Sequence, residues 1–374
     1  MEDKINQLMV NTLFKLTGKL TAPQFRNIVK KMGWKMNYHK IHVVGTNGKG
    51  SVSKYLSDNL TKDKNRVGLF TSPHIFNFEE RIKVNNENIP FLDLQDYMID
   101  IRVKFPKYTL GFFQLMFLAC LAYLETKRIN VAIFESGIGA KKDVVNYLNF
   151  DTTIFTSIGI DHEKLLGKTL EKISEDKSFA IKENNKVFYP STLNKVSEKI
   201  LQERAKLVGN ESLHSVKIDS KNIHTQNQEL SKYILKTEFN IDARWFHLPI
   251  GRAQEINING NDCAVDAGHN EEAIKETLNY FKENNVEFDY YVISLSSDKD
   301  VKNIMKYFDK ENTLIYQNKS GRALSNFDYP QEFGKVYSLP SFLKTLDKKT
   351  LFIGSFYFVE EILRLVKYDY NSKI

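Results

Sequence analysis

The sequence predicts an α/β protein of two domains, each built on a mostly parallel sheet. Short apolar strands alternate with amphipathic helices along most of the chain, which is typical of parallel sheets covered on both faces. One apolar run ends in a glycine-rich turn at residues 45–51, and the alternation resumes after a less regular stretch at residues 183–250. Because 374 residues exceed one typical domain, we predict a P-loop domain at residues 1–250 and a smaller, Rossmann-like α/β domain at residues 251–374.

The individual elements follow from hydrophobic spacing and from turn residues. Residues 1–40 predict two short helices around Pro23, leading into the first strand. Strands are expected where apolar residues run together and stop at a turn, at residues 41–44, 65–70, 131–134, 153–158, 263–265, 290–295, 313–316 and 351–353. Helices are expected where apolar residues recur at helical spacing, at residues 52–60, 95–103, 112–126, 170–182, 194–207, 271–284 and 358–366. Residues 75–95 predict a loop or hairpin, and the polar, aperiodic residues 210–228 predict no regular element.

Composition narrows the class of protein. Apolar residues make up 42% and charged residues 26%, which is ordinary for a soluble globular chain. The net charge is +7, but no arginine-rich arm or dense basic block is present. The positive charge therefore suits small polyanionic substrates better than nucleic acid. Only Cys120 and Cys263 are present and the N-terminus lacks a signal-peptide pattern, which predicts a reducing, cytoplasmic location. The most apolar run, residues 112–124, is too short to cross a bilayer.

The turn at residues 45–51, GTNGKGS, is the most informative stretch. It lies between a predicted strand and a predicted helix, which is the layout of a phosphate-binding loop. Its glycines let backbone N–H groups approach phosphate oxygens, Lys49 can reach the terminal phosphates, and Ser51 begins the helix whose positive end faces them. The loop is one residue shorter than the usual pattern, and a generic glycine-rich turn is the alternative.

Polar residues also follow the other predicted strands. Lys49, Ser72, Glu135 and His162 each come just after a strand, where parallel sheets bind their ligands. Glu135 could hold Mg²⁺ beside phosphates, or be a surface glutamate. His162 could be a second metal or phosphate ligand, and Ser72 could give a hydroxyl oxygen to the same ion or cap the turn before Pro73.

A second polar set belongs to the second domain. Arg252 follows a glycine, and Asp266, His269 and Asn270 follow a predicted strand. A guanidinium group suits phosphate oxygens, and an aspartate could accept from ribose hydroxyls or bind a cation. Lys177 lies on the helix after His162, where a solvated lysine is the ordinary interpretation.

Together these residues resemble the folylpolyglutamate synthase and dihydrofolate synthase family, within the Mur ligase superfamily of ATP-dependent amide-forming enzymes. The matching stretches, in family order, are GTNGKGS (45–51), FTSPHIFNFEERIKVN (70–85), FESGIGAKKDVVN (134–146), TSIGIDHEKLLGKTLEKISEDKSFAIK (156–182), GRAQ (251–254), VDAGHN (265–270) and IGSFYFVEEI (353–362). The resemblance implies a ligase that adds L-glutamate to a folate or dihydropteroate through an acyl phosphate. It further implies domains that close around ATP at a hinge near residues 249–254, and a monomer without nucleic-acid or membrane partners.

The resemblance also implies roles for individual residues. The residues expected to bind the ATP phosphates are Asn47, Gly48, Lys49, Gly50 and Ser51, and the expected ATP contacts of the second domain are Arg252, Asp266 and His269. Ser72 and Glu135 are expected to hold one Mg²⁺ and His162 a second, with a monovalent cation as a further cofactor. Lys177 matches the family lysine that CO₂ carbamylates. The residues expected to act in catalysis are Lys49, His162, Lys177 and Arg252.

Some stretches depart from the family. Gly137-Ile-Gly139-Ala-Lys replaces a GLGGR-type run, and Gln114 stands where a glutamate is usual. The helix after His162 reads Glu-Asp-Lys177-Ser-Phe where Glu-Lys-Ala-Gly is usual, and the motif at 266 reads Asp-Ala-Gly-His for Asp-Gly-Ala-His. The largest gap precedes Arg252, where the G-x-H-Q-x-x-N segment and two helices that help form the adenine pocket are not recognisable at residues 183–250. We therefore expect an adenine site that is rebuilt, loosened or absent.

Three functions stay open after the sequence alone. An active glutamate ligase acting on a folate or pteroate is favoured, because the chain keeps the whole expected set of metal and phosphate residues. The alternatives are a ligase of the same superfamily with another carboxylate substrate, and a nucleotide-binding protein that has lost catalysis. Nucleic-acid binding has only the net charge in its favour.

Overall fold

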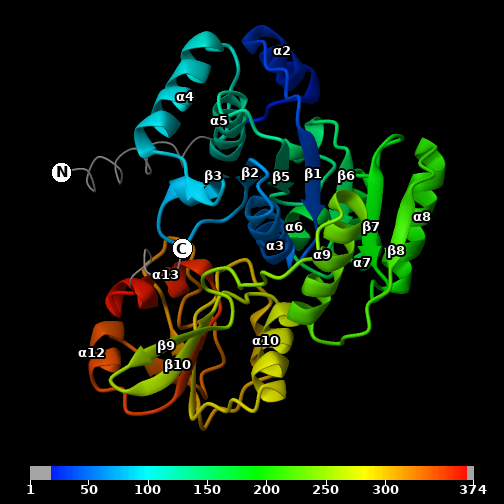
Figure 1. Ribbon diagram of the computed structural model, residues 1–374. Coiled ribbons are helices and arrows are strands. Elements are labelled where there is room, and N and C mark those ends of the chain that lie inside the picture. The colour runs from blue at the N-terminus through cyan, green and yellow to red at the C-terminus, as the bar shows by residue number, and fades with distance from the viewer. Residues whose placement is uncertain (1–17, 369–374) are drawn as a thin grey trace.

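The computed structural model describes residues 18–368, which form two sheets that follow one another in the chain. Sheet A is built on β1–β8 and sheet B on β9–β14, and Figure 1 shows the part built on sheet B below the part built on sheet A. Of the two helices predicted around Pro23, one is α2 (Ala22–Met32), which has Pro23 in its first turn, and the other lies outside the described residues. No helix in the described range is long and apolar enough to cross a membrane.

Sheet A has the strand order β4-β3-β2-β5-β1-β6-β7-β8. Its strands pair in parallel except at the β4-β3-β2 edge, where both pairs are antiparallel. Because β2, β5, β1 and β6 are neighbours and parallel, their carboxyl ends meet at the same edge. The strands are β1 (His39–Val44), β2 (Val67–Phe70), β3 (Ile82–Val84), β4 (Glu87–Asn88), β5 (Val131–Glu135), β6 (Thr152–Phe155), β7 (Lys186–Pro190) and β8 (Leu213–Val216).

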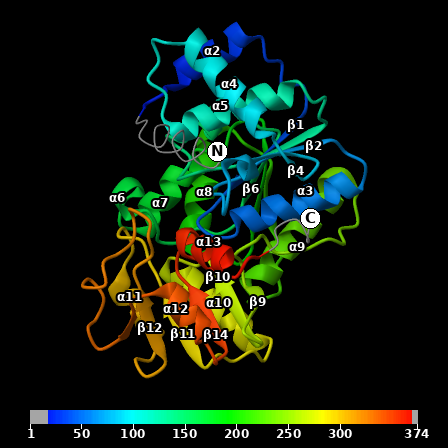
Figure 2. The ribbon, with the colours of Figure 1, turned by 90° about the vertical axis from the view of Figure 1, so that its left-hand side faces the viewer.

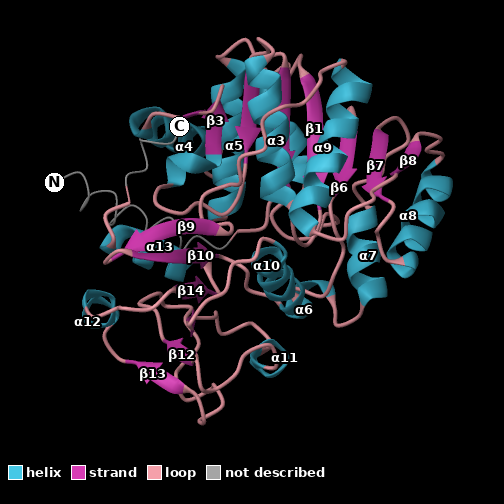
Figure 3. Ribbon diagram, turned by 60° about the horizontal axis from the view of Figure 1, so that its bottom comes forward, coloured by secondary structure: helices cyan, strands magenta, loops and turns pink. Residues whose placement is uncertain are grey.

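Helices cover both faces of sheet A (Figure 3). Alternate strand residues serve the two faces: Ile133 packs toward α3 and α9, whereas Phe134 packs toward α2, α4 and α5. Helices α7 and α8 complete the second layer, where they cover Phe155 and Val187. These helices are α3 (Lys49–Lys62), α4 (Phe91–Lys104), α5 (Phe112–Glu125), α6 (Glu163–Leu166), α7 (Leu170–Ser178), α8 (Lys195–Val208) and α9 (Ile223–Phe239), with short 3₁₀ turns η1 (Phe78–Arg81) and η2 (Val145–Tyr147).

Sheet B has the order β13-β12-β11-β14-β10-β9, and only the β10–β9 pair is antiparallel. Helices α10 and α11 pack on one face and α12 and α13 on the other. The strands are β9 (Gln254–Ile258), β10 (Asn261–Asp266), β11 (Tyr290–Ile293), β12 (Thr313–Tyr316), β13 (Gly334–Val336) and β14 (Thr350–Ile353). The helices are α10 (Glu271–Glu283), α11 (Val301–Met305), α12 (Leu339–Lys344) and α13 (Phe356–Leu365). The predicted class of two mostly parallel α/β sheets is confirmed.

The segment after β2 packs against the part built on sheet B and so joins the two parts. Ile75 is buried in the apolar core of sheet B, beside Val359 of α13. A Cβ at Gly251 would lie 2.9 Å from Val359 and 3.2 Å from Ile75, and its φ of +73° also favours glycine. Arg364 of α13 donates a hydrogen bond from Nη2 to the Phe76 carbonyl, at 2.9 Å. Figure 2 shows α13 lying between its own sheet and the part built on sheet A.

The prediction was wrong for the stretch before residue 250. Residues 210–228 contain β8 and the start of α9, so two helices, α8 and α9, do lie between residues 183 and 250. Helix α9 escapes a periodicity search because its buried apolar residues, Leu230, Ile234 and Leu235, come only after its polar first two turns. The Asn222 side chain accepts from the N–H groups of His224 and Thr225, a capping pattern that could have located its start. The other unpredicted strands and α-helices are β7, β9, β13, α6, α11 and α12, and α4 begins at Phe91 rather than residue 95.

Candidate functional site

The glycine-rich loop joins β1 to α3 at the carboxyl edge of sheet A. A Cβ at Gly45 would clash with Thr156, and one at Gly48, where φ is +85°, would lie 2.6 Å from the Asn227 Oδ1 atom. The Thr156 hydroxyl donates to the Asn47 carbonyl at 2.6 Å and holds the loop against the end of β6. Helix α3 begins at Lys49 with no side-chain cap from the described residues, so its first N–H groups are available to an anion.

Two lysine side chains end at one carbonyl of this loop. Lys49 Nζ donates to the carbonyls of Gly45 at 3.2 Å and Thr46 at 3.1 Å, and Lys177 Nζ donates to Gly45 at 2.7 Å. Lys177 is 4% exposed, so it is not a solvated helix lysine. Burial, helped by the charge of Lys49, lowers the pKa of Lys177 to about 7, and burial also lowers the pKa of Lys49. The loop therefore concentrates positive charge that an anion would neutralise.

Glu135 ends β5 and is buried, so it is not a surface glutamate. Its Oε2 accepts a hydrogen bond from the backbone N–H of Ser72 at 3.0 Å. The same carboxylate faces α3, because a Cβ at Gly50 would lie 3.8 Å from Oε2. Burial raises the pKa of Glu135, and the charge of Lys49 opposes that rise. Lys49, Ser72 and Glu135 are thus brought together at one edge of the sheet.

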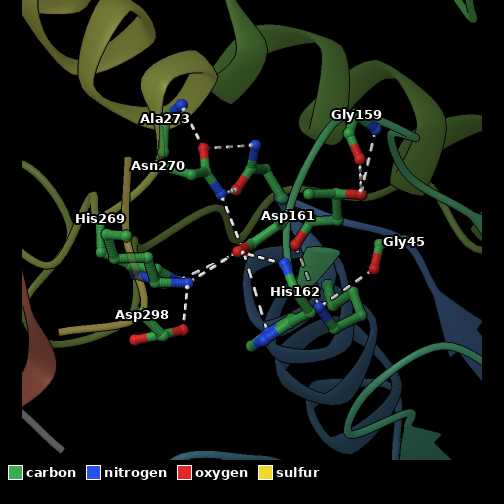
Figure 4. Close-up of polar contacts among 12 residues, drawn as sticks. Gly45, Gly159, Asp161, His162, His269, Asn270, Ala273 and Asp298 are labelled. Carbon is green, nitrogen blue, oxygen red and sulfur yellow. Dashed lines mark hydrogen bonds and ion pairs between the residues drawn. The ribbon is translucent and has the colours of Figure 1, made fainter. Parts of the chain in front are cut away.

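Asp161 connects the two parts of the molecule (Figure 4). Its Oδ1 accepts from Lys299 Nζ at 2.7 Å, and its Oδ2 accepts from Asn270 Nδ2 at 3.1 Å. The Nε2 atoms of His269 and His162 lie 3.7 and 3.9 Å from Oδ2. Burial by itself would raise the pKa of Asp161, but the nearby His269 and Lys299 hold this pKa well below its usual range.

His162 lies beside the lysines, on the loop that precedes α6. Its φ of 50° is left-handed, and burial lowers its pKa to about 4, so the ring is neutral near pH 7. Together with Lys49, Lys177 and Gly139 it lines a small cavity of about 10 Å³, which is barely enough to admit one water molecule. A neutral imidazole in this place can act as a metal ligand or as a hydrogen-bond donor.

Helix α10 of the second part reaches the glycine-rich loop itself. Asn47 Nδ2 donates to Glu272 Oε2 at 2.7 Å, and Asn270 Nδ2 donates to Asn47 Oδ1 at 3.0 Å. Asn270 also caps α10 by accepting from the N–H of Ala273 at 2.8 Å. The loop and the start of α10 are therefore held in contact by side-chain amides.

Asp266 and Arg252 occupy different positions at this boundary. The Asp266 carboxylate is buried and accepts from Ala253 N at 2.7 Å, Gly268 N at 2.6 Å and Thr277 Oγ1 at 3.0 Å. These contacts fix the turn that carries Arg252. The Arg252 guanidinium lies over the Phe356 ring, 4.8 Å from its centre, in position to meet an anion at the boundary.

A cavity of about 470 Å³ opens beside the glycine-rich loop and is lined by both parts. Its lining includes Asn47, Gly48 and Ser51 of the loop, Arg252 and Asp266 of the second part, and His224 and Asn227 of α9. His224 is buried against the Tyr280 ring, and its Nδ1 has no hydrogen-bond partner among the described residues. The cavity is large enough for a nucleotide-sized ligand.

The donor atoms at the edge of sheet A suit a hard cation. The described residues contain no group of three or more His, Cys, Asp and Glu that could hold a metal by themselves. Mg²⁺ needs no such group, because it takes one or two carboxylates and completes its shell with phosphate oxygens and water. Glu135 supplies such a carboxylate, and two serines lie near it: Ser72, whose N–H donates to it, and Ser51, one residue after the Gly50 that it faces.

The structure brings most of the predicted site residues to one boundary. Those that line a cavity or contact the loop are Asn47, Gly48, Lys49, Ser51, His162, Lys177, Arg252 and Asp266. Glu135 contacts Ser72 and faces Gly50, and His269 lies beside Asp161 instead of the loop. Sequence reasoning missed Lys299, Glu272 and Asn227, which reach the same place from other elements. The charged run at residues 298–300, in the loop between β11 and α11, was the available signal for Lys299, since polar residues in the loops after strands mark the other site positions as well.

Curated proteins with similar sequences carry folate-ligase names. The chain is 32% identical over 158 residues to the dihydrofolate synthase/folylpolyglutamate synthase of Buchnera aphidicola subsp. Baizongia pistaciae, covering 42% of this chain and 37% of that protein. It is 30% identical over 211 residues to the dihydrofolate synthetase of Saccharomyces cerevisiae, covering 54% and 49%. The matched segments thus span less than half of these relatives. No protein-family model matches the chain.

Solved structures extend the similarity of fold to the whole chain. The bifunctional folylpolyglutamate synthase/dihydrofolate synthase of Yersinia pestis CO92 superimposes with a TM-score of 0.84 at 18% identity, covering 96% of this chain and 98% of that one. A second structure of such a bifunctional enzyme, with Mn, AMPPNP and L-glutamate bound, gives 0.84 at 19% identity, covering 96% and 97%. Folylpolyglutamate synthase of Mycobacterium tuberculosis, complexed with ADP and AMPPCP, gives 0.83 at 19%, covering 97% and 98%. The predicted family resemblance and fold are confirmed.

Breaking the Asp161–Lys299 pair should loosen the contact between the two parts. Both side chains are under 10% exposed, at 9% and 7%, so Lys299→Met leaves a buried carboxylate without its cation. We expect a loss of roughly 3 kcal/mol or more in the free energy of unfolding, measured by urea denaturation. Asp161→Asn combined with Lys299→Met should cost less than the sum of the single changes, because the pair is then removed together.

The control for this prediction is Lys319→Met. Lys319 is 78% exposed and pairs at 3.7 Å with Glu361 inside the second part. Its loss should change stability by less than about 1 kcal/mol. Equal denaturation midpoints for the Lys299 and Lys319 variants would show that the buried pair does not join the two parts.

Proposed function

We propose that this protein is an ATP-dependent ligase that adds L-glutamate to a folate or to dihydropteroate. The observation that carries the proposal is the nucleotide-sized cavity lined by Asn47, Gly48 and Ser51 of the glycine-rich loop and by Arg252 of the opposite part. Lys49 and Lys177 both donate to the Gly45 carbonyl of the same loop, and Glu135 faces Gly50. A triphosphate needs this combination of backbone donors, cations and an oxygen ligand for a metal. The names and bound molecules of the similar proteins agree with this chemistry.

The nucleotide would lie across the boundary. In this proposal Asn47, Gly48, Lys49, Gly50 and Ser51 bind its phosphates through loop N–H groups and the start of α3. Arg252 and His269 would approach from the second part, while Asp266 holds the turn under Arg252.

In this proposal the adenine base of ATP binds beside helix α9. Helices α8 and α9 are both present, and the N-terminal residues His224 and Asn227 of α9 line the cavity. Of the three expectations for the adenine site, we therefore propose the rebuilt site and not its absence. It would use α9 in place of the unrecognised G-x-H-Q-x-x-N segment.

The metal set is also proposed. Ser72 and Glu135 would hold one Mg²⁺ and His162 a second, and a monovalent cation would complete the cofactors. Bound Mg²⁺ supplies positive charge that balances the phosphate oxygens during phosphoryl transfer. The residues of the chain contribute the rest: Lys49 stabilises the charge of the terminal phosphate, and Arg252 orients the nucleotide from the other side.

The proposed reaction has two steps. An oxygen of the substrate carboxylate attacks the γ-phosphorus of ATP, ADP leaves, and an acyl phosphate forms. The amine nitrogen of glutamate then attacks the acyl carbon, phosphate leaves, the amine loses a proton, and an amide results. The role of the protein is to hold the three reactants in line and to exclude water, which the contact between the two parts supports.

We further propose that Lys177 is carbamylated by CO₂. Its neutral amine attacks the carbon of CO₂ and releases a proton, which turns a cation into an anionic oxygen ligand. The low pKa of Lys177, about 7, supports this because the neutral amine is then abundant near neutral pH. The carbamate would lie beside Lys49, whose charge stabilises an anion there.

The domain division and the cellular setting belong to the same proposal. A hinge near residues 249–254 is supported by the left-handed Gly251 and Ala253 between α9 and β9. It would separate a P-loop domain at residues 1–250 from a C-terminal domain at residues 251–374. A reducing, cytoplasmic location is supported by the free thiols of Cys120 and Cys263, and a monomer is proposed.

Release of ADP tests the function directly. The protein would be incubated with Mg²⁺, ATP and L-glutamate, with dihydropteroate, with a tetrahydrofolate or with neither. We expect turnover that requires glutamate and at least one of the two pterins. ATP binding without turnover in all three mixtures would favour a different carboxylate substrate or a nucleotide-binding protein without catalysis.

Lys49→Ala and Glu135→Ala should each abolish turnover with the fold intact. The expected loss is at least about 100-fold in kcat, because each change removes charge stabilisation of the transferring phosphate. The matched control is Lys54→Ala, one turn further along α3, where the lysine pairs with Asp58 instead of facing the loop. Turnover like that of the wild type in either site variant would exclude the proposed site.

Carbamylation of Lys177 should depend on pH and on CO₂. Because its pKa is about 7, the neutral amine and hence the carbamate should increase as the pH rises through 7. A ¹³C NMR signal from labelled CO₂ would follow it, and Lys177→Ala should lose the signal and regain part of its activity with small carboxylates. Lys172→Ala, on the exposed face of the same helix, is the control. No carbamate signal at neutral or alkaline pH would contradict the proposal.

A further inference from the structure

We propose that Arg81 binds a carboxylate group of the substrate at the boundary between the two parts; this inference rests on the ligase activity proposed above. Arg81 ends the short turn η1, just before β3. Its side chain is buried at 7% exposure, although arginine is seldom buried without a partner. The ligand it would take is a carboxylate that a planar guanidinium can bind through two parallel hydrogen bonds.

The guanidinium has an unsatisfied positive charge. Among the described residues its only hydrogen bond runs from Nε to Nδ1 of His74, at 2.9 Å, and none of their carboxylates forms an ion pair with it. The neighbouring Glu80 is not free to do so, because its two oxygens accept from three backbone N–H groups, those of Ile75, Phe76 and Asn77. A buried cation in this state is unfavourable unless an anion joins it.

The groups around Arg81 suit a carboxylate. Since His74 Nδ1 accepts from Arg81, the proton of the neutral ring is on Nε2, which makes that atom a second donor. The Phe112 ring lies against the guanidinium, 5.6 Å from its centre, and limits the access of water.

The position connects Arg81 to the reaction centre. The Arg81 carbonyl accepts from the N–H of Thr71 at 3.0 Å, and the next residue, Ser72, donates its N–H to Glu135, the proposed metal ligand at the end of β5. A few residues on, the Phe76 carbonyl accepts from Arg364 of α13 at 2.9 Å. A carboxylate on Arg81 would therefore lie close both to the proposed metal ligand and to the second part, where the substrates must meet. Two substrates carry such a group, the folate or pteroate and the incoming amino acid.

Steady-state kinetics of Arg81→Gln tests the inference. We expect the KM of one carboxylate substrate to rise roughly 10- to 100-fold, while the KM for ATP stays within about twofold. A rise for L-glutamate assigns the site to the amino acid, and a rise for the pterin substrate assigns it to the acceptor. For the amino acid, the preference of the wild type for L-glutamate over its amides should also shrink in the variant. Arg81→Lys should be intermediate, because it keeps the charge without the fork.

The controls distinguish a loss of substrate binding at Arg81 from misfolding and from a failure of the proposed ligase function. Arg66→Gln changes an exposed arginine before β2 and should leave every KM unchanged. If Arg81→Gln does not fold, as judged by thermal melting, Arg81→Lys alone decides. If the wild type shows no turnover, the ligase proposal fails, and calorimetric binding of L-glutamate and of a tetrahydrofolate to wild type and variant still tests Arg81. Equal affinities for both ligands, or a uniform rise of all three KM values, would overturn the inference.

Discussion

The carboxylate of Asp161 forms a buried ion pair between the two halves of this molecule. It comes from the carboxyl edge of sheet A and accepts at 2.7 Å from Lys299 and at 3.1 Å from Asn270, which both belong to the part built on sheet B. Because the pair with Lys299 is almost fully buried, its cation and its anion need each other. The positions of His162, of the glycine-rich loop and of α10 all follow from this contact, since each lies one residue or one hydrogen bond away from Asp161 or Asn270.

The other buried charges at the boundary are less well balanced. Lys49 and Lys177 share the Gly45 carbonyl, Glu135 accepts from one backbone N–H, and Arg81 donates to a neutral histidine. Burying ionised groups so incompletely paired costs stability, and a protein gains from this only where ligands supply the missing charges. The triphosphate, the metal and the substrate carboxylate of the proposed reaction would supply charges of the required signs.

The sequence was most informative where local backbone geometry or hydrophobic spacing determines the type of residue. The loop at residues 45–51, the alternation of strands and helices, and polar residues directly after strands can all be identified without tertiary contacts. Helix α9 could not be identified from periodicity, because its packing surface against α3 uses few apolar residues and its first turns face a cavity. The sequence therefore did not reveal that α9 lines the cavity beside the glycine-rich loop.

By itself the sequence determined the fold class, the glycine-rich loop and the residues that come after strands β1, β2, β5 and β6. These depend on hydrophobic period and on glycine geometry, which act between neighbours in the chain. Only the tertiary structure decided which side chains are buried without a partner and which elements face one another. Lys299 and Asp161 are 138 residues apart, and the value of their contact depends on burial that no local pattern encodes. The same holds for Arg81. Its guanidinium is buried and forms no ion pair with a carboxylate of the described residues, which depends on tertiary packing and not on the neighbouring sequence.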